Sequence, residues 1–167
     1  KFSKTENIKW VTALPGRSAA TPIIWNDVVF VSSTDEATRT LRAMCLSRGD
    51  GKVLWNEETG KGYNRVDRNN LASPSPVTDG KIAVFLYGTG DLVAFDLGGK
   101  KLWTRNLESE YGPFTYNWTY SASPTLFEGK LLIAVLQRDT AVRGRGRTDS
   151  TNPSYLLALD PATGKEL

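Results

Sequence analysis

The stretch CLSRGDGKVLW at residues 45–55 returns twice later in the chain. It reads AFDLGGKKLW at residues 94–103 and ALDPATGKEL at residues 158–167, so every copy holds Gly-Lys-x-Leu. Gly51 and Gly99 lie 48 residues apart, whereas Gly99 and Gly164 lie 65 apart, with the extra length in one loop. A fainter copy, Asn-Ile-Lys-Trp, ends at Trp10. The chain is therefore built from an internal repeat of about 48 residues.

A second shared element precedes each full copy. It reads AATPIIWNDVVFV at 19–31, SPSPVTDGKIAVFL at 73–86 and SASPTLFEGKLLIAV at 121–135. Small residues ending in Pro, a polar turn and a β-branched apolar run predict two strands, and the apolar stretch before the Gly-Lys turn predicts a third. A fourth strand follows the turn. We expect this order of strand, turn, strand, loop, strand, Gly turn and strand in every copy.

Four short antiparallel strands at this period are typical of a β-propeller blade. We therefore predict an all-β fold, a β-propeller of four-stranded antiparallel blades with about three and a half blades in this chain. The predicted boundaries are 1–14 for the end of a preceding blade and 15–60, 61–107 and 108–167 for three blades. A solenoid of β-hairpins is the structural alternative.

The Gly-Lys-x-Leu-Trp turns resemble the pyrroloquinoline-quinone-like propeller repeat family of the bacterial envelope. That family includes quinoprotein dehydrogenases and BamB-like proteins, and its tryptophan-docking motif reads Ala-x-Asp-x-x-Thr-Gly-Lys-x-x-Trp. The third copy matches it from Ala158 to Lys165, the second lacks the Thr, and the first has Cys45 and Ser47 in place of Ala and Asp. The resemblance implies seven or eight blades in a complete ring, so we expect this chain to be part of one.

The repeated residues predict structural roles. Gly permits a turn with positive φ, a Trp ring packs between blades, and Asp accepts hydrogen bonds from turn N–H groups. The predicted docking residues are Gly51, Trp55, Asp96, Gly99, Trp103, Asp160 and Gly164. Trp10 is expected to close a blade in the same way, and Trp25 to lie in a turn.

Composition excludes several kinds of chemistry in this stretch. The 167 residues contain no His and one Cys, which rules out an imidazole base, a His-containing zinc site and an intramolecular disulfide. Lys and Arg total 21 against 18 Asp and Glu, with both signs interspersed, so a nucleic-acid partner is not expected. No apolar run reaches the ~18 residues of a membrane span.

Partner binding is expected in the loops that enter the first strand of each blade, because propeller sites lie where these loops meet. Polar and aromatic residues gather there, although packing between blades is an equally good explanation of the aromatic ones. The candidate partner-binding residues are Arg68, Asn69, Asn70, Tyr116, Asn117, Trp118 and Tyr120.

These observations favour a non-enzymatic, periplasmic or secreted scaffold that binds a protein or peptide partner. The remaining blades of the ring are further expected contacts. We predict no catalytic, cofactor-binding or metal-binding residue in this chain and no cofactor. One alternative is a dehydrogenase that uses pyrroloquinoline quinone and calcium, with its site completed by blades elsewhere. A carbohydrate-binding propeller is another.

Overall fold

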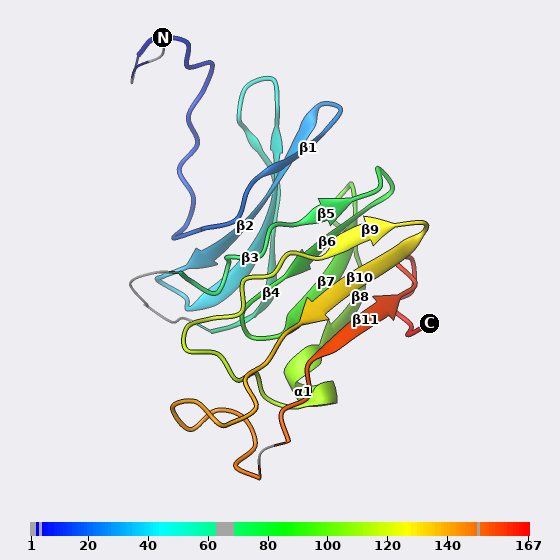
Figure 1. The fold of residues 1–167 in the computed structure, drawn as a ribbon. Helices are drawn as coiled ribbons and strands as arrows, with labels where there is room; N and C mark the ends of the chain where they lie inside the picture. The colour runs from blue at the N-terminus through cyan, green and yellow to red at the C-terminus, as the bar shows by residue number, and fades with distance from the viewer. Residues whose placement is uncertain (1–2, 4, 63–68, 150) are drawn as a thin grey trace.

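The computed structural model describes residues 3, 5–62, 69–149 and 151–167. Its regular secondary structure is almost wholly antiparallel strands, arranged in three sheets (Figure 1). The first sheet contains β1 (Ile23–Trp25), β2 (Val28–Asp35), β3 (Thr40–Ser47) and β4 (Val53–Lys61). The second contains β5 (Val77–Thr78), β6 (Ile82–Leu86), β7 (Asp91–Asp96) and β8 (Lys101–Asn106). The third contains β9 (Thr125–Phe127), β10 (Lys130–Val135) and β11 (Tyr155–Leu159).

The strands of each sheet follow one another as neighbours in the order of the chain. This arrangement, together with the structural comparisons given below, confirms the prediction of an all-β propeller built from antiparallel blades. The blade boundaries proposed from the sequence stay predictions.

The structure differs from the sequence-based prediction in two elements. The third sheet has three strands rather than four, because the segment after the turn at Gly164 pairs only through the bridge between Leu159 and Glu166. A short helix, α1 (Leu107–Tyr111), follows β8 and was not predicted. Asn106 caps it, its side-chain oxygen accepting a hydrogen bond from the Ser109 N–H at 2.9 Å.

Because successive strands run in opposite directions, every second connection of a sheet lies at the same end of the molecule. The turns β1–β2, β3–β4, β5–β6, β7–β8 and β9–β10, with the turn at Gly164, form what we call the turn end. Figure 1 shows the first turns of the three sheets side by side there. The longer connections, including residues 107–124 and 136–154, form the opposite loop end.

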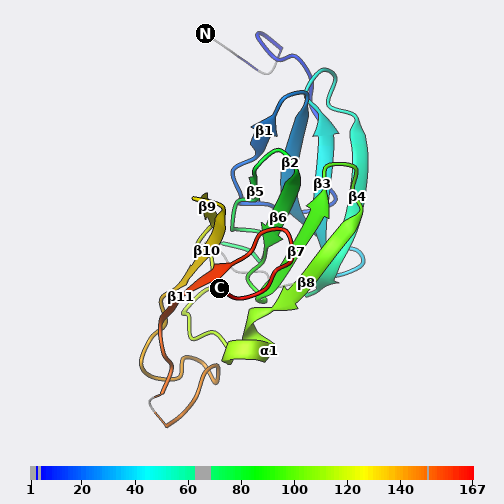
Figure 2. The ribbon, with the colours of Figure 1, turned by 90° about the vertical axis from the view of Figure 1, so that its right-hand side faces the viewer.

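The central sheet lies between the other two (Figure 2), and its inner strands β6 and β7 are the buried ones. Phe85 and Phe95 pack toward the first sheet, against Phe30 and the ring of Trp55. Its opposite face packs on Leu131, Ile133 and Leu157 of the third sheet, together with other aliphatic side chains. All five residues of β6 are buried, which explains why its sequence is a continuous apolar run instead of an alternating one.

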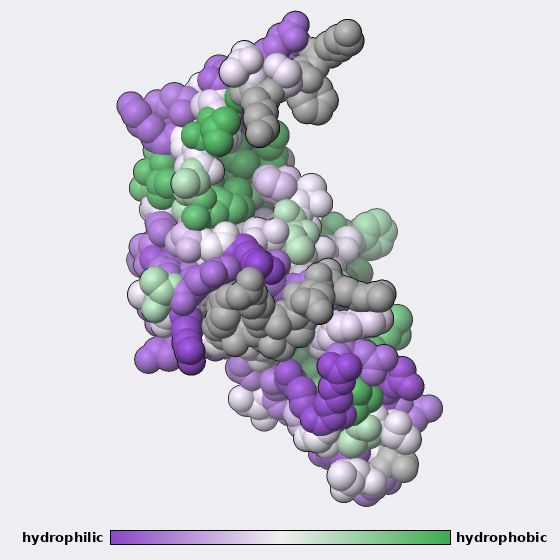
Figure 3. Space-filling view, turned by 90° about the vertical axis from the view of Figure 1, so that its left-hand side faces the viewer, coloured by the Kyte–Doolittle hydropathy of each residue, from purple (hydrophilic) through white to green (hydrophobic). Residues whose placement is uncertain are grey.

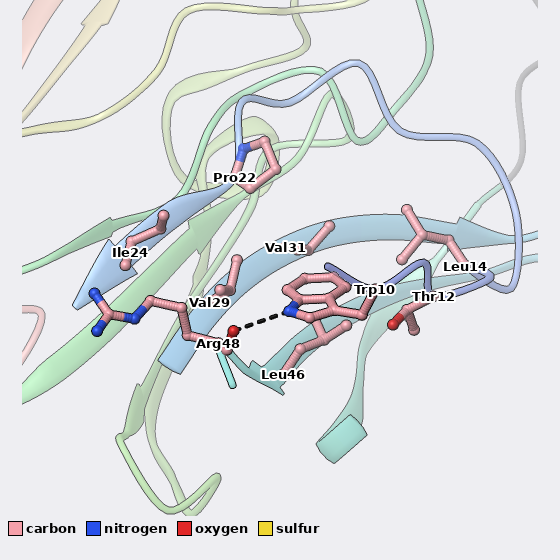
Figure 4. A pocket seen from close by; sticks show the side chains of 9 residues that line it. All are labelled: Trp10, Thr12, Leu14, Pro22, Ile24, Val29, Val31, Leu46 and Arg48. Atoms are coloured by element: carbon pink, nitrogen blue, oxygen red, sulfur yellow. Dashed lines mark hydrogen bonds between the residues drawn. The ribbon is translucent and has the colours of Figure 1, made fainter. Parts of the chain in front are cut away.

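The outer face of the first sheet is covered only in part. Val29, Val31, Met44 and Leu46 form a separate apolar cluster there, with Trp10 and Leu14 packed against it. A hollow of about 370 Å³ lies between this N-terminal segment and the sheet (Figure 4). Figure 3 shows apolar side chains gathered on the same side of the molecule, next to the N-terminal segment.

The first strands of neighbouring sheets are joined by a ladder of hydroxyl groups. Thr21, Ser75 and Ser123 hold the same place in the repeat, each directly before a proline. The Thr21 N–H donates to Ser75 Oγ at 2.8 Å, and the Ser75 N–H donates to Ser123 Oγ at 3.0 Å. The hydroxyls of Ser75 and Ser123 thus each satisfy a backbone donor of the preceding repeat.

Replacing Ser75 with Ala is expected to lower the free energy of unfolding by about 0.5–1.5 kcal/mol, since one inter-sheet hydrogen bond is lost. Urea unfolding of the purified protein measures this change. Ser75→Thr retains the hydroxyl and is the matched control. An Ala variant as stable as the Thr variant would mean that the ladder contributes nothing to stability.

Among the described residues, no helix has the length and apolar character needed to cross a membrane.

Candidate functional site

Three tryptophan rings each lie on a glycine of the following turn. A Cβ added at Gly99 would stand 2.7 Å from Cγ of Trp55, and one at Gly164 would stand 2.7 Å from Cδ2 of Trp103. The indole N–H groups donate to backbone carbonyls of the same turns, Trp55 to Leu97 at 3.0 Å and Trp103 to Pro161 at 2.9 Å.

The N-terminal segment makes the same contact through Trp10. Its ring lies on Gly51, and its indole N–H donates to the Arg48 carbonyl at 2.9 Å. Gly51, Gly99 and Gly164 all have positive φ, between 71° and 93°. Only a glycine combines this backbone conformation with room for the ring.

The aspartates of the repeated motif shape the turns. Asp96 Oδ1 accepts a hydrogen bond from the Lys100 N–H at 2.9 Å, and Asp160 Oδ1 accepts one from the Ala162 N–H at 2.8 Å. In the first copy Asp50 takes this part, accepting from the Lys52 N–H at 3.2 Å. These carboxylates are engaged in hydrogen bonds within their own turns.

Sequence reasoning missed a fourth tryptophan contact. Trp25, expected in a turn, is the last residue of β1, and its ring lies against Gly80 in the β5–β6 turn. Gly80 has φ +86°, and a Cβ there would come within 2.2 Å of Cζ2 of Trp25. The glycine in the second turn was the only available signal, because the Trp itself is absent from the other copies.

At the loop end, the segment that contains Trp118 is fixed on one side through Thr115. Thr115 Oγ1 donates to the Arg138 carbonyl at 3.0 Å, and the Thr115 N–H donates to Gln137 Oε1 at 3.0 Å. Asn152 holds the longer loop beside it, accepting from the Arg147 N–H at 2.6 Å. An ion pair between Arg145 and Glu108 ties that loop to α1.

The other side of the same segment is fixed by Asn69 and Asn70. Asn69 Nδ2 donates to the Thr119 carbonyl at 2.9 Å and to Ser121 Oγ at 2.8 Å. The Asn70 carbonyl accepts from Thr119 Oγ1 at 3.0 Å, while its side-chain oxygen accepts from the Ala72 N–H at 2.9 Å. Both side chains are engaged within the chain, and Arg68 lies outside the described residues.

The aromatic residues of this segment divide into packed and exposed ones. Tyr120 is 2% exposed and donates to the Ala134 carbonyl at 2.9 Å, with its ring stacked 5.0 Å from that of Phe114. Tyr116 is half-buried beside them, and burial raises its pKa to about 12. Asn117 is exposed, and the Trp118 side chain is 50% exposed. Of the predicted aromatic candidates, Trp118 is the most exposed.

A protein-family comparison agrees with these repeats. The family model described as "Outer membrane protein assembly factor BamB" matches residues 3–115, more than half of the chain. The chain belongs to this BamB-like family. A comparison with curated protein sequences gave no significant match.

Solved structures resemble the BamB-like chain in fold. BamB from Moraxella catarrhalis is 13% identical with a TM-score of 0.52, and the match covers 93% of this chain and 40% of that one. A europium-containing methanol dehydrogenase is 16% identical with a TM-score of 0.58, covering 87% and 23% respectively. Quinohemoprotein alcohol dehydrogenase from Comamonas testosteroni is 17% identical with a TM-score of 0.54, covering 90% and 20%.

At these identities the likeness shows the fold alone. The BamB-like chain spans less than half the length of each of the three proteins.

The donor groups of the BamB-like chain do not fit the calcium ion that a quinone-dependent dehydrogenase uses. Calcium takes six to eight oxygen ligands, several of them from carboxylates. In residues 3, 5–62, 69–149 and 151–167, no three His, Cys, Asp or Glu side chains come close enough together to hold a metal ion. The lone Cys45 is buried, and this burial raises its thiol pKa to about 11.

Proposed function

We propose that this BamB-like chain is a non-enzymatic β-propeller scaffold that binds a protein or peptide partner in the bacterial cell envelope, in the periplasm or outside the cell. The observation that carries the proposal is the half-exposed Trp118 on a segment fixed at both sides. The description of the family as an outer membrane protein assembly factor supports the envelope location.

A tryptophan presented in this way suits protein recognition. Trp is enriched among the few residues that dominate binding energy at interfaces. A segment already held by Thr115 on one side and Thr119 on the other loses little conformational freedom on binding, so more of the contact energy appears as affinity. The exposed amide of Asn117 beside the ring offers both a donor and an acceptor to a peptide backbone.

The first experiment identifies the partner by contact. A photo-crosslinking amino acid is placed at position 118 in the full-length protein in its bacterial host, and at position 127 as a control at the turn end. We expect a discrete protein adduct from position 118 only, which mass spectrometry identifies. The identified partner is then purified for affinity measurements.

Trp118→Ala is expected to weaken binding of that partner about thirtyfold, the effect of losing a central aromatic contact. Phe127→Ala removes a similarly exposed aromatic ring from the opposite end and should leave the affinity unchanged. Isothermal titration calorimetry measures both. Equal affinities for the wild type and Trp118→Ala would refute the role of Trp118, as would adducts formed only at the turn end.

A quinone-dependent alcohol or sugar dehydrogenase is the second candidate, favoured by the two dehydrogenases among the structural neighbours. It requires pyrroloquinoline quinone and calcium held by blades beyond these residues. Dye reduction by the full-length protein with quinone, calcium and an alcohol or sugar would support it and contradict the scaffold role. A glycan array with wild type and Trp118→Ala separates the carbohydrate-binding alternative.

A further inference from the structure

Large apolar side chains are exposed to solvent at equivalent positions of the repeat at the turn end. Trp25 and Phe127 hold the same position, directly before the first tight turn of their sheets, and are 39% and 59% exposed. Leu54 and Leu102 hold another common position, directly before the docked tryptophan, and are 55% and 42% exposed. Single exposed apolar residues are normal on protein surfaces, but repetition at equivalent sites on one end is not.

Open sheet faces do not account for the exposure of Leu102 and Trp25, whereas Phe127 lies on the face of the third sheet that no other described sheet covers. Leu102 belongs to the central sheet, which has a sheet on either side, and it is still 42% exposed. Trp25 packs on Gly80 of the next sheet and keeps 39% of its surface in solvent. Packing between blades therefore leaves these side chains free to contact something outside the sheets.

Lysines accompany the apolar residues. Six of the ten lysines lie in or directly beside these turns, and all six are exposed: Lys52, Lys81, Lys100, Lys101, Lys130 and Lys165. Among the described arginines, Arg138, Arg143, Arg145 and Arg147 lie in the connection between β10 and β11 at the loop end. A lysine next to an exposed apolar group is the combination found at membrane interfaces, where the stem lies along apolar surface and the ammonium reaches the headgroups.

Several acidic residues of the turns, unlike the lysines, hold their charge close to the backbone. The carboxylates of Asp50, Asp79, Asp96 and Asp160 accept hydrogen bonds from backbone N–H groups of their own turns. Lys52 also pairs with Asp50, at 3.3 Å, while 81% of its side chain is exposed. Asp27, Glu128 and Glu166 add three exposed acids, so the turns carry seven acidic residues beside the six lysines and Arg48. Long lysine side chains thus extend beyond carboxylates that are held against the backbone.

We propose that the turn end is a membrane-contacting surface for a bilayer that contains anionic lipid. Trp25, Leu54, Leu102 and Phe127 enter the headgroup layer, and the lysines reach lipid phosphates. These apolar side chains are spread over three sheets and from the first strands to the outermost ones. A flat fluid surface contacts all of them at once, whereas an extended peptide contacts one strip. The loop end with Trp118 then faces away from the bilayer.

The test is flotation of the purified full-length protein with vesicles of phosphatidylethanolamine and phosphatidylglycerol, and with vesicles of phosphatidylcholine alone. We expect binding to the anionic vesicles, weaker binding to phosphatidylcholine, and weakening by salt. The combined replacements Leu54→Ser, Leu102→Ser and Phe127→Ser should reduce the partition coefficient about tenfold or more. Leu136→Ser, which removes a 74% exposed apolar side chain at the loop end, is the matched control and should bind like the wild type.

A second readout follows the depth of Trp25. Brominated lipid in the vesicles should quench part of the tryptophan fluorescence, and Trp25→Phe, which keeps a ring on Gly80, should remove that part. Absence of binding to anionic vesicles would overturn the proposal. Equal binding to phosphatidylcholine, binding that survives the triple replacement, or loss of binding in Leu136→Ser alone would do the same. Partner binding by Trp118 is measured without lipid, so either proposal can fail alone.

Discussion

Phe85→Ala is expected to lower the free energy of unfolding by about 3–5 kcal/mol, enough to unfold a marginal domain. Phe85 is fully buried between the first two sheets. Its ring centroid lies 5.9 Å from that of Phe95, 6.1 Å from that of Trp55 and 6.4 Å from that of Phe30, mostly in edge-on contacts. Truncation removes the ring shared by all three, and the stiff sheets cannot close the cavity.

Urea unfolding followed by tryptophan fluorescence measures the loss, because Trp55 reports directly on this cluster. Phe127→Ala, in which the ring removed is 59% exposed, is the control and should change stability by no more than about 0.5 kcal/mol. A loss below about 1 kcal/mol for Phe85→Ala would mean that the first two sheets do not pack through this cluster.

Gly99→Ala is expected to disrupt the β7–β8 turn strongly. The substitution places a residue with a Cβ at a positive φ of 93°, which lowers the free energy of unfolding by about 1–2 kcal/mol. The added methyl also meets Trp55 Cγ at 2.7 Å, and overpacking of this kind costs about 1–3 kcal/mol more. The two effects together predict a loss of about 2–5 kcal/mol, measured by thermal and urea unfolding.

Substitutions at two other glycines separate the effect of backbone strain from the effect of contact with the Trp55 ring. Gly98→Ala lies one residue away without a positive φ and meets only Asp96 Oδ1 at 3.3 Å, so it should be nearly neutral. Gly112 has φ +100° with nothing within 4 Å of an added Cβ, so Gly112→Ala reports backbone strain alone. If Gly99→Ala costs no more than Gly112→Ala, the ring of Trp55 does not need the glycine.

The repeat made the strand order readable from sequence, together with the expectation that the repeated glycines form turns and that the repeated tryptophans pack between blades. That each ring lies on the glycine of the following turn is visible only in the structure, because the distance from Trp to that Gly varies from copy to copy. Trp25 escaped this reasoning because its position is occupied by Phe127 in the third copy and by Asp79 in the second. A contact that is made in only one copy does not recur along the sequence, so it gives no periodic signal.

The candidate site was predictable as a region and not as a set of side chains. Spacing located the long loops, but the burial of Tyr120 depends on Phe114 and on the Ala134 carbonyl, which are brought to it by the third sheet. Asn69 meets Thr119 across 50 residues of sequence. Such contacts between distant loops follow no local pattern, so the sequence could not separate the presented Trp118 from its packed neighbours.

The tryptophan contacts have a direction: the first and second sheets each place a ring on the glycine of the next sheet and receive a ring on their own glycine, and the third sheet receives Trp103 on Gly164. The first and second sheets therefore have the same two mating surfaces. Gain or loss of a whole repeat preserves every junction, since the sheets that become neighbours meet through the same pair of groups. Duplication of a repeat therefore requires no newly evolved interface, because the tryptophan ring of one sheet fits against the glycine backbone of the next.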